Sequence, residues 1–149
     1  MNETEAREEI EALHLFFVDW FGGLIEKDEA VFQMRFAQRF ASDCELIQPS
    51  GDTLSRQVFF NAVEKSHGSS PDFRIAIRNV RIRFDLPGDY ALVSYEEWQR
   101  NAVNSTPQDN ARAASVLFAR DAANGALQWC HIHETWLPEK QTPPERFDF

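Results

Sequence analysis

Cysteine is scarce in this sequence, with only Cys44 and Cys130 among 149 residues. The two form no CxxC pair and show no zinc-ligand spacing, which excludes the common zinc-ribbon and dithiol redox motifs. We interpret both as small buried hydrophobic residues in a reducing compartment. Long apolar runs are also missing, so no segment reaches the length of a membrane-spanning helix. The acidic residues 1–11 lack the features of a secretion signal, and we predict a cytoplasmic location.

Basic charge is in deficit, because 15 Lys and Arg face 24 Asp and Glu and the formal net charge is −9. Nucleic acid and anionic membranes both need clustered basic charge, so neither is a predicted partner. The sequence also has no P-loop, no dinucleotide-binding glycine pattern and no GxSxG elbow. Phosphoryl transfer, nicotinamide chemistry and acyl-enzyme catalysis are therefore not expected, and no cofactor is predicted.

Aromatic residues are abundant, with 13 Phe and 4 Trp. Large rings fill a wide core or line an apolar cavity, and composition leaves both readings open. The length suits one domain, which we place at residues 1–138, followed by a tail at 139–149.

Three helices are predicted before residue 70. The first carries an apolar stripe at helical spacing, formed by Ala6, Ile10, Leu13, Phe17, Trp20 and Leu24. Gly22 and Gly23 indicate that it ends there or that another backbone approaches closely. Asp28 is the expected N-cap of a second, shorter helix that carries Val31, Met34 and Phe36. Ser55 is the expected N-cap of a third, whose inner face holds Val58, Phe59, Ala62 and Val63.

Alternating residues predict strands over the rest of the chain. A short strand is expected at 44–48, and three long ones at about 90–101, 112–121 and 127–137. A fourth begins near Phe73, and its inward parity slips by one residue after Ile77. This slip predicts a β-bulge near Arg78 and Asn79, which would bend the sheet strongly. Helices packed on a bent antiparallel sheet form an α+β cone with a cavity, which is the default binding site.

The order of these elements resembles the nuclear transport factor 2-like superfamily, also described as a cystatin-like fold. The run from Trp129 to Pro138, with its His131-Ile132-His133 centre, is similar to the last strand of SnoaL-like proteins. It also resembles the association domain of calcium/calmodulin-dependent protein kinase II, as does the preceding run from Ser115 to Arg120. The resemblance implies a homodimer formed through the outer face of the sheet, and a pocket between sheet and helices.

Aligning the strands with this superfamily implies a set of pocket residues. Glu134 and Glu96 are the catalytic candidates, since burial raises a carboxyl pKa into the range useful for acid/base work. The implied ligand-binding residues are Phe36, Phe40, Phe60, Asn61, Ser94, Trp98 and Ser115. The kinase domain carries arginines where this chain has Ser94, Ser115 and Glu134, which favours a cation or a neutral polar ligand here.

Each candidate also has a structural interpretation. Glu96 and Glu134 could instead face solvent or pair with arginines, and tryptophans more often fill a core or interface than stack on a ligand. If Glu134 points inward, strand alternation turns His131 and His133 outward, so we predict no metal site. The leading prediction is a small-molecule-binding homodimer. The alternatives are a cofactor-independent isomerase, cyclase or dehydratase, and a pure oligomerisation module.

Overall fold

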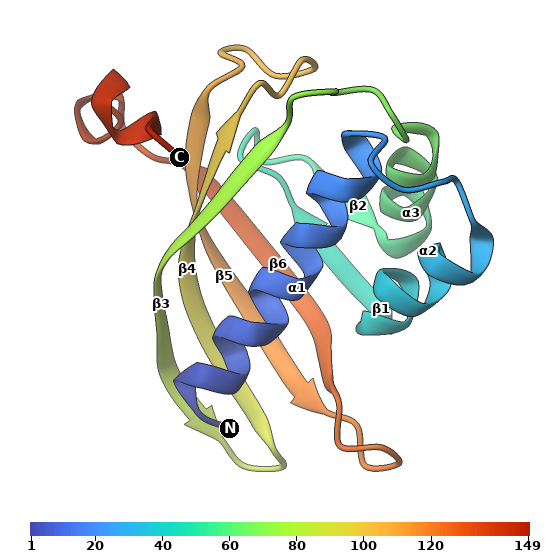
Figure 1. The fold of residues 1–149 in the computed structure, drawn as a ribbon. Helices are drawn as coiled ribbons and strands as arrows, with labels where there is room; N and C mark the ends of the chain where they lie inside the picture. The colour runs from blue at the N-terminus through green and yellow to red at the C-terminus, as the bar shows by residue number, and fades with distance from the viewer.

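The structure, a computed structural model, describes residues 1–149. Three helices and a mixed six-stranded sheet form an α+β cone, in which α1 lies across the concave face of the sheet (Figure 1). None of the helices combines the length and the apolar composition needed to cross a bilayer. In chain order the elements are α1 (Glu3–Phe21), α2 (Glu29–Arg35), the 3-10 turn η1 (Ala37–Arg39), β1 (Phe40–Ile47), β2 (Thr53–Ser55), α3 (Arg56–Lys65), β3 (Arg74–Leu86), β4 (Tyr90–Arg100), β5 (Asn110–Arg120), β6 (Leu127–Trp136), η2 (Glu139–Gln141) and η3 (Pro144–Phe147).

The end of α1 explains its two glycines. The helix stops at Phe21, and Gly23 takes a left-handed φ of 66° that other residues rarely adopt. A Cβ atom on Gly23 would lie 3.3 Å from the Cα of Gly68, so the two backbones pack closely here. Leu24 therefore lies beyond the helix and is exposed, although the stripe had placed it inside.

Both predicted N-caps of the later helices are confirmed. The Asp28 carboxylate accepts a hydrogen bond from the Val31 amide at 2.9 Å, and the Ser55 hydroxyl accepts one from the Val58 amide at 3.3 Å. The inner face predicted for the third helix is right in part, because Val63 is buried and Phe59 packs against the core, whereas Val58 is exposed and Phe60 is buried instead. In α2 the buried side chain is Phe32, while Met34 is exposed.

The sheet has the strand order β2-β1-β6-β5-β4-β3. Strands β3 to β6 form the expected antiparallel meander, and β1 adds to β6 in parallel. The predicted bulge is confirmed, because the β3–β4 register shifts between Arg78 and Arg81 and Asn79 has a φ of 54°. It lets Ile77 and Val80 both face the helices and bends β3 around α1.

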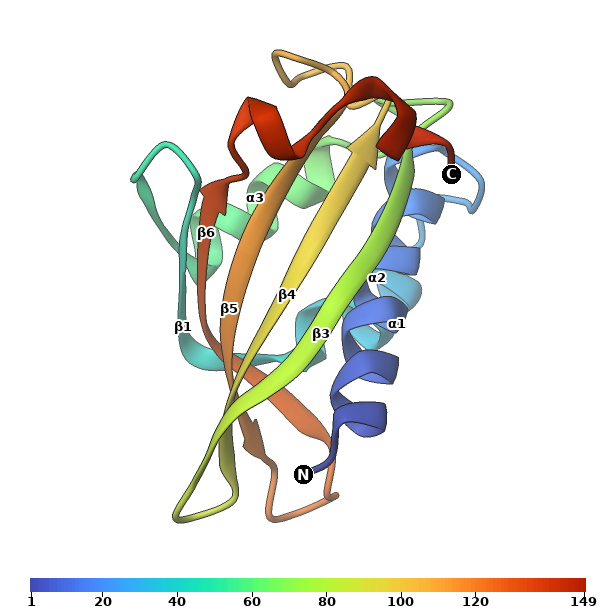
Figure 2. The same cartoon turned by 90° about the vertical axis from the view of Figure 1, so that its left-hand side faces the viewer.

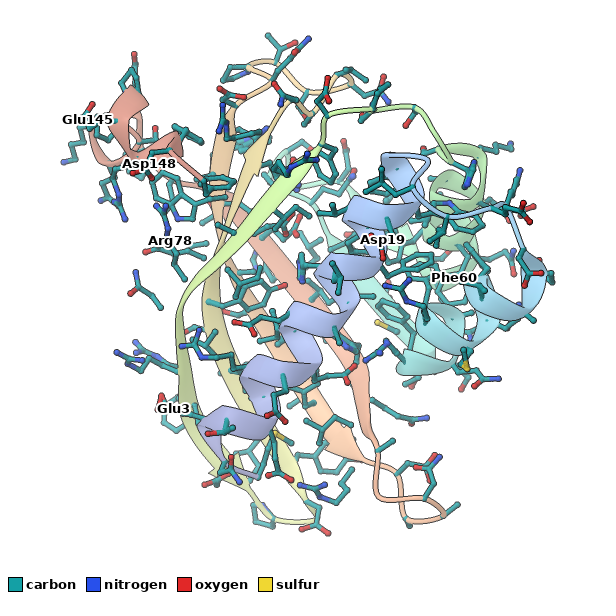
Figure 3. All side chains as sticks on the ribbon, in the orientation of Figure 1. Glu3, Asp19, Phe60, Arg78, Glu145 and Asp148 are labelled. Carbon is teal, nitrogen blue, oxygen red and sulfur yellow. The ribbon has the colours of Figure 1, made fainter.

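Aromatic rings fill the space between the helices and the sheet. Phe16 stacks on Phe36 with ring centroids 5.4 Å apart, and Phe36 packs edge-on against Phe40 at 5.1 Å. Figure 3 labels Phe60 within this layer. The many phenylalanine rings thus fill one wide core. The remaining space lies at the open end of the cone.

The tail after β6 lies across the outer, convex face of the sheet (Figure 2). It covers Trp98, which is fully buried although it points away from the helices. The Phe147 ring lies 5.1 Å from that indole, and the guanidinium groups of Arg78 and Arg146 stack on it at 4.6 and 4.2 Å. Figure 3 shows Arg78 outside β3, below the tail.

Candidate functional site

A cavity of about 230 Å³ lies between the concave face of the sheet and the ends of α1 and α3. Hydrophobic side chains supply 14 of its 21 lining residues, among them Phe17, Phe21, Phe59 and Trp129. The remaining lining residues are polar, and they come from α1, from the positions that follow β1 and α3, and from β4, β5 and β6: His14, Gln48, Ser66, Glu97, Gln99, Arg112 and Glu134.

Strand register places these polar groups side by side. On β4 the inward residues are Tyr95, Glu97 and Gln99. Glu97 lies opposite Arg112 on β5, while Tyr95 lies opposite Ala114, which in turn lies opposite Glu134 on β6. Because Ala114 is small, space remains between the Tyr95 and Glu134 side chains. Helix α1 closes the cluster from above with His14.

His14 and Glu97 form a buried ion pair, with side chains 3% and 6% exposed. Nδ1 of His14 donates to the Ile10 carbonyl at 2.7 Å, so Nε2 faces a Glu97 oxygen at 3.1 Å with one proton between them. Burial alone would raise the pKa of Glu97, but the charges of His14 and Arg112, together with hydrogen bonds from His14 and Gln99, outweigh it and lower that pKa to about 2. The attraction of Glu97 raises the pKa of His14 against the effect of burial. Imidazolium and carboxylate are therefore the stable forms.

Glu134 and Arg112 form the second pair, with Nη1 and Oε2 3.1 Å apart and side chains 9% and 14% exposed. Burial raises the pKa of Glu134 to about 7, because desolvation and the charge of Glu97 exceed the attraction of Arg112. Arg112 also donates through Nη2 to the Asn110 side chain at 3.2 Å. Its Nε is buried and has no hydrogen-bond partner.

A second, polar cavity of about 210 Å³ adjoins the first at the open end of the cone. The two share Phe21, Ser66, Phe73, Gln99 and Arg112, so Arg112 stands at their junction. We call this second space the vestibule. Its other lining residues come from the α3–β3 and β4–β5 connections: Ser69, Ser70, Ala102, Asn104 and Ser105.

Several predicted pocket residues lie elsewhere. Glu134 and Phe40 line the cavity, and the roles assigned to them stay predictions. Phe36 and Phe60 are buried in the aromatic core, and Asn61 is exposed on α3. The prediction that four further residues face the cavity is wrong, because they occupy the outer face of the sheet: Ser94, Glu96, Trp98 and Ser115.

Their misplacement is a one-residue error in the parity of β4 and β5. Ser94 lies opposite Ser115, which lies opposite His133, so these three form one outer row. Glu96 accepts hydrogen bonds from Trp98 and Asn79, both at 2.9 Å, and so serves the outer face. No group of three or more His, Cys, Asp or Glu side chains is arranged to hold a metal ion.

Solved structures with this architecture define its class. A nuclear transport factor 2-like protein of unknown function from Pseudomonas aeruginosa is 26% identical, with a TM-score of 0.78 over 90% of this chain and 99% of that one. A provisionally assigned dehydratase of the same superfamily from Streptomyces avermitilis is 13% identical, with a TM-score of 0.64 over 91% and 95%. A provisional kinase II association domain from Thiobacillus denitrificans is 17% identical, with a TM-score of 0.59 over 87% and 93%.

The chain therefore has the nuclear transport factor 2-like, or cystatin-like, fold. The model of one family, described as sucrose-6-phosphate phosphohydrolase C-terminal, matches residues 6–138. The chain belongs to this family. A comparison with curated proteins gives no match.

Proposed function

We propose that this protein is a homodimeric small-molecule-binding domain whose ligand occupies the cavity beside Arg112 and Glu134. The observation that carries the proposal is the buried polar cluster on the floor of an otherwise apolar cavity. Apolar side chains of similar size often stabilise a fold as well as a buried ion pair does, or better. Two adjacent buried pairs facing open space are therefore better explained by a ligand than by stability.

The name of the family does not identify the ligand of this chain. A sugar phosphate carries many hydroxyl groups and a doubly charged phosphate, whereas two thirds of the lining residues here are hydrophobic, 14 of 21. The single arginine of the cavity is also already paired with Glu134. We accordingly propose a ligand that is smaller and more apolar than a sugar phosphate.

We also propose a cytoplasmic location, which agrees with the two free thiols of Cys44 and Cys130.

A second candidate function is cofactor-independent acid/base catalysis by Glu134. Its pKa of about 7 gives it both protonation states at neutral pH, as a proton-transfer group needs. It also faces the same cavity as Tyr95. A protein with the same fold, from Streptomyces avermitilis, is provisionally assigned as a dehydratase. Binding is the primary proposal because it requires only the cavity.

The outer face of the sheet is the proposed dimer interface. Large apolar side chains lie exposed at its lower end, where Phe84 is 63% exposed and Tyr90 is 42% exposed. Their strand neighbours Leu92 and Leu117 continue the same face towards Ser115. Since contiguous exposed apolar surface marks contact sites, a second copy is the proposed occupant. The tail covers the upper end of this face (Figure 2).

A blocked-mouth variant tests the binding function. Ser66 lines both the cavity and the vestibule, so Ser66→Trp should fill their junction. The matched control is Lys65→Trp, which adds the same ring one residue away on the exposed surface of α3. In ligand-observed NMR with a mixture of small aromatic fragments, we expect saturation transfer to the fragments from wild type and from the control but not from Ser66→Trp. Equal transfer from all three proteins, or transfer from none, would leave a pure oligomerisation module as the better account.

A further inference from the structure

Arg112 is the one cation in the cavity cluster with an unmet bonding capacity. Its guanidinium has five N–H donors. Nη1 bonds Glu134 and Nη2 bonds Asn110, while Nε is buried without any partner. An unpaired buried donor is costly, and a carboxylate can bond two neighbouring guanidinium N–H groups at once. The unpaired Nε of Arg112 therefore suits a carboxylate ligand at the junction of cavity and vestibule.

The charges around Arg112 leave one negative charge to be supplied. Glu97 faces Arg112 from β4, but its charge is balanced by His14 from α1. Glu134, from β6, is the only other acidic side chain lining the cavity, and Tyr95 is held neutral because burial raises its pKa well above its usual value. When Glu134 takes a proton, the four groups His14, Glu97, Arg112 and Glu134 carry a net charge of +1.

The shape of the cavity limits the rest of the ligand. Its volume of about 230 Å³ equals about eight water molecules at ~30 Å³ each. That space suits a ligand body of about eight non-hydrogen atoms, one for each water volume. Rings such as Phe17, Phe59 and Trp129 line it, so the body is apolar or aromatic. The polar vestibule begins at Arg112, which places the charged end of the ligand towards the mouth.

We propose that the cavity selects small apolar monocarboxylic acids, whose carboxylate bonds Arg112 in place of Glu134 while Glu134 takes one proton from solvent. This inference rests on the proposed small-molecule function and names the ligand class for it. Glu134 then acts as an internal counterion that holds Arg112 until a ligand arrives. A dianion would leave one charge uncompensated in the buried cluster, and a cation would face Arg112.

Three compounds of one shape test this class: phenylacetic acid, phenylacetamide and 2-phenylethylamine. They share the aromatic body and carry charges of −1, 0 and +1 at pH 7. We expect calorimetry to show the acid binding best. With a pKa of about 7 for Glu134, acid binding should weaken about tenfold from pH 6 to pH 8, since the ligand needs the protonated carboxyl. The acid itself stays ionised throughout this range.

Two variants separate the roles of the pair. Glu134→Gln removes the titrating group and keeps Arg112, so acid binding should become independent of pH between 6 and 8. Arg112→Met removes the cation, so the preference for the acid over the amide should disappear. Circular dichroism on both variants checks that each is folded.

The possible outcomes separate a failure of the proposed ligand class from a failure of the proposed small-molecule-binding function. Preference for the amide or the amine would overturn the monocarboxylate class and leave small-molecule binding in place. Acid binding that does not change with pH in wild type would overturn the exchange with Glu134. Binding of none of the three at millimolar concentration would overturn the class, and the Ser66→Trp comparison with the broader fragment mixture would then decide the function separately.

Discussion

Glu134 should make the protein less stable as pH rises, and Glu134→Gln should remove that effect. Its pKa is about 7 in the folded chain against an ordinary 4.5. A raised carboxyl pKa means that the folded state holds the proton more tightly than the unfolded state. The stabilising contribution is therefore complete below pH 4.5 and is lost as pH rises through 7.

The two pKa values set the size of the effect. Relative to a carboxyl that stays protonated in both states, Glu134 lowers the free energy of unfolding by about 3 kcal/mol at pH 8 and by about 1 kcal/mol at pH 5, where mainly the unfolded chain is ionised. Because glutamine resembles the protonated carboxyl in shape, Glu134→Gln should be more stable than wild type by about these amounts. Urea unfolding of both proteins from pH 5 to pH 8 measures the gap between them. A gap that stays constant over this range would refute the raised pKa and with it the exchange of Glu134 for a ligand carboxylate.

Three further perturbations test other parts of the structure. His14→Leu should cost about 3 kcal/mol in urea unfolding at pH 7, because it removes the cation that is hydrogen-bonded to the buried Glu97 carboxylate and leaves that charge only the Gln99 amide and the nearby Arg112. Glu97→Gln should cost less than half as much, since its amide can donate to a neutral imidazole. Phe147→Ala should uncover Trp98, so acrylamide quenching of tryptophan fluorescence should increase; unchanged quenching would show that the tail does not cover the indole in solution. Leu117→Asp should convert the proposed dimer to monomer in native mass spectrometry, and a dimer of unchanged mass would move the interface away from the outer face.

The fold was predictable because its signals are local. The caps at Asp28 and Ser55 and the bulge at Asn79 depend on a few neighbouring residues, and all three are confirmed. Strand β2 was missed because three residues are too few to show alternation. The parallel pairing of β1 with β6 joins residues far apart in the chain, and no local pattern encodes it.

The site was less predictable, and the reason lies in β4. Both of its faces carry apolar residues: Val93 faces the helices, while Trp98 is covered by the tail. Alternation then gives no clear inner face, and the alignment with the superfamily assigned the wrong one. The same alignment placed Glu134 on the inner face of β6, where Ile132, two residues earlier, belongs to the core. A charge match between Glu97 and Arg112 on neighbouring strands was the signal that would have corrected the parity.

The central claim is that a small molecule binds inside the cone, and amide chemical-shift mapping tests it most directly. Labelled protein would be titrated with phenylacetic acid and with the fragment mixture, and the shifted backbone amides placed on the structure. We predict that they cluster around the cavity, at His14 on α1, Glu97 on β4, Arg112 on β5 and Glu134 on β6. Shifts confined to the outer face of the sheet, or no shifts at all, would contradict the account.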